Sequence, residues 1–226
     1  MKIGVISDIH SNRYALDAVL EKLSGVDTVI CAGDVTGYYL WPGEVIQRLK
    51  EEDIRSVRGN HDDAVATGLA FRFNPVARKA VDINRELLDD RELEYLKDLP
   101  DHMRWDLGGK DTYMVHGSPR RPISEYIYAG DVDRDFLDEN FDRKPRVLIM
   151  GHTHMPFAKN VGATLVLNPG SVGQPRDGDP RASYAILDTE KMEARVHRAR
   201  YAIDEVVEEA GDRLPERLLQ RLKKGR

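Results

Sequence analysis

The chain has 226 residues, 41% of them hydrophobic and 32% charged, so it has enough apolar material for a core in one domain over residues 1–226. A formal charge of −5 argues against a basic surface that coats nucleic acid, and the single cysteine excludes an internal disulfide. No run of about 18 apolar residues is present, and the N-terminus turns polar too early for a signal peptide, so we expect a cytoplasmic protein with no membrane partner.

The first 60 residues alternate short apolar segments with helical patterns. Residues 3–6, 28–32 and 54–58 are predicted as strands, and residues 13–23 place leucine and valine on one face of a helix. Pro42 suits the first turn of a second helix, whose apolar side carries Val45, Ile46 and Leu49. This alternation predicts a largely parallel sheet covered by helices on its outer face.

The rhythm changes after residue 62. Residues 63–99 contain helical patterns around 76–88 and 92–99 and no strand pattern, so we predict a helical insert. Strands are predicted again at residues 112–115, 147–150, 164–168, 182–187 and 194–198. These late strands follow each other through turns, which indicates a second, more antiparallel sheet. Residues 201–226 are predicted as C-terminal helices, and the last of them carries a leucine face.

Five short motifs each follow a predicted strand. They are Asp8-Ile9-His10, Gly33-Asp34, Gly59-Asn60-His61-Asp62, His116-Gly117 and Gly151-His152-Thr153-His154. Ligands of open α/β sheets bind outside the carboxyl ends of the strands, so we expect these loops to converge on one crevice. Carboxylate, amide and imidazole groups in this mixture suit two divalent metal ions acting on a phosphate ester. Imidazole ligands favour Mn, Fe, Ni, Co or Zn over Mg.

The motifs, in this order, resemble the pattern of the calcineurin-like metallophosphoesterase superfamily, which reads D-x-H, G-D, G-N-H-D/E, H and G-H-x-H. The chain length and residues 168–173, Asn-Pro-Gly-Ser-Val-Gly, resemble the compact prokaryotic branch that includes small phosphodiesterases. The resemblance implies an α/β fold: a four-layer α/β/β/α sandwich of two mixed sheets flanked by helices.

The resemblance also implies a role for each motif residue. The first metal would be bound by Asp8, His10 and His154, the second by Asn60, His116 and His152, and both would be bridged by Asp34. His61 would face the leaving group as the catalytic acid, with Asp62 behind it as an orienting partner or as a helix cap. The implied reaction is hydrolysis of a phosphate ester, most simply a diester, by attack of a metal-bridging hydroxide.

Other functions remain open at this stage. A phosphomonoesterase acting on a phosphoprotein or nucleotide would use the same metals. A non-catalytic binding scaffold is a remote alternative, because every ligand position and the acid position are filled. The expected partner is a phosphate-ester substrate, and the motifs are compatible with a nucleotide-like ester. The acidic composition makes nucleic acid an unexpected partner, and the oligomeric state is left open.

Three residues near the motif loops are candidates for substrate binding: Asn12, Arg13 and Arg176. Arginine can bind a phosphoryl group through two parallel hydrogen bonds. Asn12 suits helix capping equally well. The aromatic run at residues 38–41 follows Asp34, and we interpret it as core packing in preference to a surface on which a base stacks.

Overall fold

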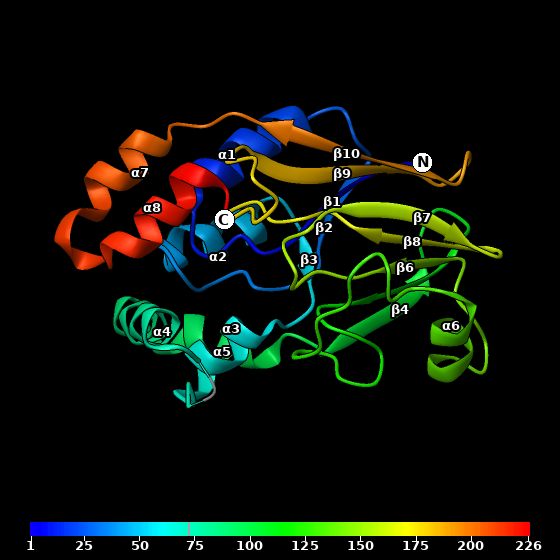
Figure 1. Ribbon diagram of the computed structural model, residues 1–226, viewed down its shortest axis with the longest axis horizontal. Coiled ribbons are helices and arrows are strands. Elements are labelled where there is room, and N and C mark those ends of the chain that lie inside the picture. The colour runs from blue at the N-terminus through cyan, green and yellow to red at the C-terminus, as the bar shows by residue number, and fades with distance from the viewer. Residues whose placement is uncertain (72) are drawn as a thin grey trace.

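The computed structural model describes residues 1–71 and 73–226, which form ten strands and eight α-helices (Figure 1). One mixed sheet has the strand order β10 (Glu193–Ala199), β9 (Ala182–Asp188), β1 (Lys2–Ile6), β2 (Thr28–Cys31) and β3 (Arg55–Ser56). The other has the order β4 (His102–Asp106), β5 (Asp111–Val115), β6 (Val147–Ile149), β8 (Thr164–Asn168) and β7 (Phe157–Val161). We call these the first and the second sheet.

The two sheets pack face to face, with helices on their outer faces. Side chains of β1 and β2, such as Val5 and Ile30, meet Ile149 and Leu167 from the second sheet in a fully buried cluster. The opposite face of the first sheet packs on α1 (Arg13–Lys22) and α2 (Pro42–Glu51). The opposite face of the second sheet packs on α6 (Arg134–Asn140), where Phe136 is buried. The predicted four-layer arrangement of two mixed sheets is confirmed.

The strands that make up each sheet, and their directions, differ from the prediction in two respects. The last two strands, β9 and β10, belong to the first sheet, because β9 pairs antiparallel with β1. In the second sheet β6 pairs in parallel with β5 and with β8, so only its edge strands β4 and β7 are antiparallel. The first sheet is therefore less parallel, and the second more parallel, than the turn pattern indicated.

The predicted insert is helical and packs beside the catalytic-motif loops. It consists of α3 (Asn60–Thr67), α4 (Pro75–Leu87) and α5 (Asp90–Asp98), and residue 72 lies outside the described residues. The C-terminal helices α7 (Ile203–Ala210) and α8 (Glu216–Lys224) pack against α4 and the buried residues 38–41. The aromatic run is thus mostly core, as interpreted from the sequence. In the described part of the chain no helix is long and apolar enough to cross a membrane.

Candidate metal centre

The loops that bear the motifs lie at the carboxyl ends of parallel strands. Asp8 follows β1, Asp34 follows β2 and Asn60 begins α3 after β3, all in the first sheet. His116 follows β5 and His152 follows β6, both in the second sheet. Backbone hydrogen bonds from Asp8 and His10 to the Gly33–Asp34 loop hold the loops after β1 and β2 together. The two sheets therefore bring the predicted ligands to one place.

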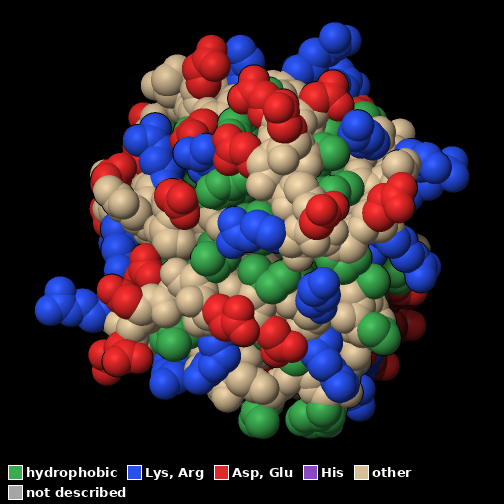
Figure 2. Space-filling model, turned by 90° about the vertical axis from the view of Figure 1, so that its left-hand side faces the viewer, with side chains coloured by type: hydrophobic (Ala, Val, Ile, Leu, Met, Phe, Trp, Pro, Cys, Tyr) green, Lys and Arg blue, Asp and Glu red, His purple; other side chains and the backbone are tan. Residues whose placement is uncertain are grey.

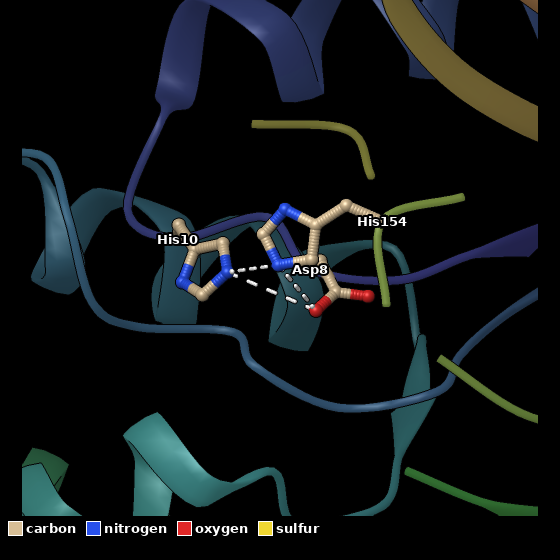
Figure 3. Close-up of side chains that lie close together, drawn as sticks. All are labelled: Asp8, His10 and His154. Carbon is tan, nitrogen blue, oxygen red and sulfur yellow. Dashed lines mark hydrogen bonds and ion pairs between the residues drawn. The ribbon is translucent and has the colours of Figure 1, made fainter. Parts of the chain in front are cut away.

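The first candidate site contains Asp8, His10 and His154, whose side chains point toward one another (Figure 3). His154 Nε2 lies 3.1 Å from Asp8 Oδ1 and 3.1 Å from His10 Nε2. The other carboxylate oxygen, Asp8 Oδ2, accepts hydrogen bonds from Ser7 Oγ at 2.6 Å and from the His152 backbone N–H at 3.1 Å. Asp8 is thus oriented through Oδ2, and Oδ1 faces the two histidines.

The second candidate site contains Asp34, His116 and His152, with Asn60 beside them. His116 Nε2 lies 3.2 Å from Asn60 Oδ1, 3.2 Å from His152 Nδ1 and 3.3 Å from Asp34 Oδ2. The same oxygen of Asp34 is 3.7 Å from His10 Nε2 in the first site. Asp34 therefore lies between the two groups of ligands, where a bridging carboxylate would have to be.

The polar atoms at the first site need a cation. His10 Nδ1 and His154 Nδ1 face the backbone carbonyls of Thr36 and Gln174, and these contacts assign the ring proton to Nδ1 in both residues. Both Nε2 lone pairs then point at each other and at Asp8 Oδ1, which is buried without a hydrogen-bond donor. A divalent ion with nitrogen and oxygen ligands fits these converging lone pairs.

A backbone carbonyl also orients a histidine ring at the second site, but here the histidine carries a proton more readily than those of the first site. His116 Nδ1 lies 2.8 Å from the Ala32 carbonyl, so the Nε2 atom faces the ligand cluster. Burial alone would lower the pKa of His116, but the carboxylates of Asp34 and Asp8 outweigh it and raise the pKa to about 9. Burial lowers the pKa of His152 to about 3. A metal ion would therefore displace a proton from His116 at neutral pH.

The loops hold the ligands in an unusual backbone conformation. Left-handed φ angles between 52° and 66° occur at five proposed ligands, Asp8, His10, Asp34, His152 and His154. This region is disfavoured for residues with a Cβ atom and is tolerated most often in short polar residues. The motif glycine Gly59 relieves crowding, because a Cβ there would lie 2.0 Å from Asp34 Oδ1. Position 59 therefore requires glycine, because the backbone there lies against the Asp34 side chain.

His61 lines the cavity above Asp34 and is close enough to be considered a ligand itself. Its ring meets His10 edge-on at 4.7 Å, and it forms a compact group with His10 and Asp34. His61 Nδ1 is buried without a hydrogen-bond partner. Burial lowers the pKa of His61 to about 4, although the Asp34 carboxylate acts in the opposite direction. The imidazole is therefore neutral at neutral pH.

Asp62 does not bond to the His61 ring. Its carboxylate accepts hydrogen bonds from the backbone N–H groups of Val35, Thr36 and Gly59 and from the Thr36 hydroxyl. Asp62 therefore occupies the third position of α3 in a capping arrangement and ties the Asp34 loop to the start of that helix. Of the two predicted roles, these hydrogen bonds support helix capping, from the third helical position and not from the N-cap, which is Gly59.

Two predicted substrate contacts lie away from the cavity. Asn12 is fully buried and caps α1: its Oδ1 accepts from the Ala15 N–H, and its Nδ2 donates to the Gly173 carbonyl. Arg13 is 39% exposed and pairs with Glu209. Asn12 therefore takes the capping role that the sequence left open beside substrate binding, and the substrate contact predicted for Arg13 is wrong, because α1 directs that side chain toward Glu209.

The third predicted contact, Arg176, does line a cavity beside the metal ligands. The cavity has a volume of about 610 Å³ and includes Asp34, His61 and His152. Arg176 donates a hydrogen bond to the Tyr38 hydroxyl at 3.1 Å, and its Nε atom is buried without a partner. Arg121 also lines the cavity. A guanidinium at this position is available to an anionic group.

Sequence reasoning missed the polar residues that orient the ligand loops from behind. Ser171 Oγ donates to the Asp8 carbonyl and accepts from the Gln174 N–H, while the Gly173 N–H donates to the Asp8 carbonyl. The Gln174 carbonyl in turn accepts from His154. These residues lie within or next to the stretch 168–173 that supported the resemblance, which was the available signal. The backbone hydrogen bonds themselves could not be predicted, because they do not depend on residue type.

Comparison with known proteins agrees with this geometry. The calcineurin-like phosphoesterase superfamily domain matches residues 1–192. The crystal structure of a metallophosphoesterase from Sphaerobacter thermophilus is 38% identical, with a TM-score of 0.84 over 100% of both chains. The protein MJ0912 of Methanocaldococcus jannaschii is 34% identical over 99% of this chain and 98% of its own.

A third relative carries a functional name. Phosphodiesterase YfcE of Escherichia coli K12 is 30% identical over 85% of this chain and 90% of its own length. The residues matched by the family domain include all five motifs, and candidate metal-binding clusters are present in the structure. The chain belongs to the calcineurin-like phosphoesterase superfamily, a family of metal-dependent hydrolases of phosphoric esters.

Proposed function

We propose that the protein is a phosphodiesterase that uses two divalent transition-metal ions, chosen from Mn, Fe, Ni, Co and Zn. The observation that carries this proposal is the position of Asp34 Oδ2, which lies 3.3 Å from His116 Nε2 and 3.7 Å from His10 Nε2. One carboxylate oxygen is thus shared by two groups of imidazole nitrogens. A pair of bound ions would supply Lewis-acid stabilisation of phosphoryl charge and lower the pKa of water.

The ligand set leaves the site suited to an anion. Two carboxylates, Asp8 and Asp34, would face two divalent cations, while the remaining ligands would be neutral when bound. Excess positive charge therefore remains for a phosphoryl group, and Arg176 adds a further positive charge at the cavity wall. Asn60 contributes an oxygen without reducing this charge. The expected substrate is accordingly a phosphate ester, and a nucleotide-like ester is compatible with the cavity.

His61 would act on the leaving group. Because its pKa is lowered to about 4, the ring enters the reaction neutral and would stabilise the departing oxygen by donating a hydrogen bond from its N–H group. Tyr38 packs on both His61 and His10 with ring centroids 4.6 Å away, which holds the two rings in place. Positioned proton donors contribute roughly 10²–10⁴-fold to a rate.

The preference for a diester over a monoester rests on the relatives named phosphodiesterases, including one from Escherichia coli, and on the size of the cavity. A monoester leaves three unesterified oxygens to be neutralised, whereas a diester needs room for an organic group on each side of phosphorus. Ligand-binding cavities for organic molecules range over roughly 300–1,000 Å³, and this one falls within that range.

The proposal is tested by comparing hydrolysis of bis(4-nitrophenyl) phosphate and 4-nitrophenyl phosphate after adding Mn, Ni, Zn or Mg to metal-free protein. We expect a metal-dependent rate that is higher on the diester. His61→Ala should retain both metal ions and lose at least a hundredfold in kcat. Asp34→Ala should bind neither ion tightly, as measured by calorimetry and elemental analysis.

Three outcomes would contradict parts of this proposal. A dominant monoester rate would make the protein a phosphomonoesterase. Loss of metal in His61→Ala would show that His61 is a metal ligand and not an acid. This outcome has to be tested because His61 lies close to Asp34 and His10. Absence of metal-dependent hydrolysis of either ester would favour a binding scaffold.

A further inference from the structure

The cavity beside the metal centre has one wall that is apolar. Leu69, Phe71, Phe73 and Ala77 line it from the segment between α3 and α4 and from the first turns of α4. We call these four residues the insert wall. Leu69 is 64% exposed and Phe71 is 68% exposed, which is unusual for large hydrophobic side chains. Hydrophobic side chains protrude at the lower edge of this end of the molecule, where the insert lies (Figure 2).

The insert wall begins at the proposed acid. The Phe73 ring meets the His61 ring edge-on, with centroids 4.7 Å apart and planes at 85°. His61 in turn packs on Tyr38 and faces the Asp34 side of the site. A group that leaves toward His61 would meet Phe73, and the more exposed side chains of Leu69 and Phe71 line the same cavity. This places the apolar surface on the leaving-group side of the cavity.

The same cavity also has polar and cationic lining. Arg121 and Arg176 line it, and Tyr126 stacks on His152 with ring centroids 3.9 Å apart. Within the described residues, no carboxylate lies at ion-pair distance from Arg176. The cavity thus offers guanidinium groups suited to phosphoryl oxygens as well as an apolar surface. A substrate that fits both must combine an anionic phosphate with an apolar organic group on the leaving side.

We propose that the insert wall is the binding site for the leaving group, and that the preferred substrates are phosphate diesters whose leaving group carries an aromatic ring. Aromatic rings favour edge-to-face and offset contacts with one another, which Phe73 and Phe71 offer. An aliphatic group of small size would leave most of this wall in water. The inference rests on the proposed function, because it needs hydrolysis at the metal centre to define which group leaves.

The test varies the leaving group and keeps its acidity constant. The two substrates are methyl 4-nitrophenyl phosphate and a methyl fluoroalkyl phosphate whose alcohol has the same pKa as 4-nitrophenol. The measured quantity is the ratio of their kcat/KM values with metal-loaded protein. We expect the wild type to favour the aryl ester by roughly tenfold or more, the discrimination typical of a modest apolar contact.

The variant Leu69→Ser/Phe71→Ser should lower this ratio severalfold, while Phe73 retains part of the preference. Both side chains are largely exposed, so the variant should fold. Leu87→Ser is the matched control, because Leu87 is 42% exposed on α4 of the same insert and does not line the cavity. It should retain the wild-type ratio. Inhibition by phenylphosphonate relative to methylphosphonate gives a second measurement, and the preference for the phenyl compound should fall in the double variant by the same factor.

The outcomes separate the two proposals. An aryl-to-alkyl ratio that is the same in the wild type and the double variant, together with unchanged phosphonate preference, overturns the insert wall as a subsite and leaves the phosphodiesterase intact. An equal change in Leu87→Ser also overturns it. Absence of metal-dependent hydrolysis of both diesters by the wild type overturns the proposed function, and the phosphonate preference then decides on the subsite alone.

Discussion

Each histidine at the candidate metal centre is buried. A proton and a metal ion compete for the same lone pair on its ring nitrogen. His116 stands apart from its neighbours. Its Nε2 atom faces two ionised carboxylates, and these raise its pKa to about 9 against the effect of burial. Burial lowers the pKa of His61 to about 4 and that of His152 to about 3. His116 is therefore the imidazole that carries a proton at neutral pH when metal is absent.

A pH dependence of the metal-free protein follows from His116. Its folded pKa of about 9 lies above the ordinary value of 6.5, so its contribution to stability is fully present below pH 6.5 and is lost as pH rises through 9. We expect the free energy of unfolding to fall by on the order of 2–3 kcal/mol between these limits. Urea unfolding in the presence of a chelator measures this change.

The control for this prediction is His116→Gln, which keeps a polar side chain and removes the titration. Its unfolding free energy should change much less between pH 6.5 and pH 9. Binding of Mn to the wild type at pH 7 should also release a proton, detectable by calorimetry in buffers of different ionisation enthalpy. Metal binding without proton release, or a flat profile in the wild type, contradicts the assignment.

Single residues differ in how well the sequence predicted them. The seven proposed ligands could be named because residue type, glycine neighbours and strand ends coincide in their motifs. Asn12 and Arg13 lie equally close to His10 in sequence, yet Asn12 is buried as a helix cap and Arg13 points to Glu209. The local position of Asn12 was compatible with capping, whereas the direction of the Arg13 side chain depends on tertiary packing with α7, which carries Glu209. Arg176 lines the cavity beside the proposed ligands, and its contact with substrate stays a prediction.

At the scale of elements, helix α4 supports the metal loops through one side chain. Asn84 is fully buried; its Oδ1 accepts from Ser11 Oγ at 2.5 Å and from the Gly37 N–H at 2.9 Å. Its Nδ2 donates to the Tyr39 carbonyl at 2.7 Å. One asparagine thus joins the insert to the loops that follow β1 and β2. The insert is therefore part of the support of the site as well as a cavity wall.

Asn84→Ala should destabilise the protein strongly. The substitution removes the partner of the Ser11 hydroxyl proton and of the Tyr39 carbonyl, and it leaves the Gly37 N–H with only its 3.2 Å bond to Ser11 Oγ. We expect the free energy of unfolding to fall by about 3 kcal/mol. Asp82→Ala, on the exposed side of the same helix, should change it by less than ~0.5 kcal/mol. Denaturant titration of both variants without metal measures the difference, and equal stability of the two would refute this role.

The strands β4 and β7 and the helix α6 were not predicted, because each has a weak or short hydrophobic pattern. Strands β4 and β7 are edge strands in which exposed residues alternate with more buried ones, so neither is a continuous apolar run. β4 reads His-Met-Arg-Trp-Asp, and the alternation of Met103 and Trp105 with polar residues was the available signal. The helix α6 has seven residues, too few for a clear period. The buried central strands, which are continuous apolar runs, were predicted.

At the scale of the whole molecule, the metal centre joins the two sheets. Asp8, His10 and Asp34 come from loops of the first sheet, whereas His116 and His152 come from loops of the second. We propose that residues 1–226 unfold as one domain when metal is bound, because bound ions would connect loops from both sheets. The pairing of β9 and β10 with the first sheet could not be read from the sequence, since periodicity does not specify a strand's partner.

This arrangement predicts how metal stabilises the fold. Mn at about a thousandfold excess over its Kd should raise the free energy of unfolding by ~4 kcal/mol. Hydrogen exchange should slow in the loops of both sheets together. Asp34→Ala should lose this response, and Glu205→Ala, an exposed acidic residue on α7, should keep it. Protection confined to the loops of one sheet would show that the ions do not join the two.

The left-handed backbone at five proposed ligands has a consequence for the history of such a chain. Each of these residues costs roughly 1 kcal/mol or more relative to glycine in the same conformation. Drift under selection for folding alone would therefore replace them, and the first changes expected are to glycine. A descendant that had abandoned hydrolysis would grow more stable as it lost these side chains. All five positions in this chain carry a side chain able to bind a metal ion, and not the glycine that the backbone conformation alone would favour.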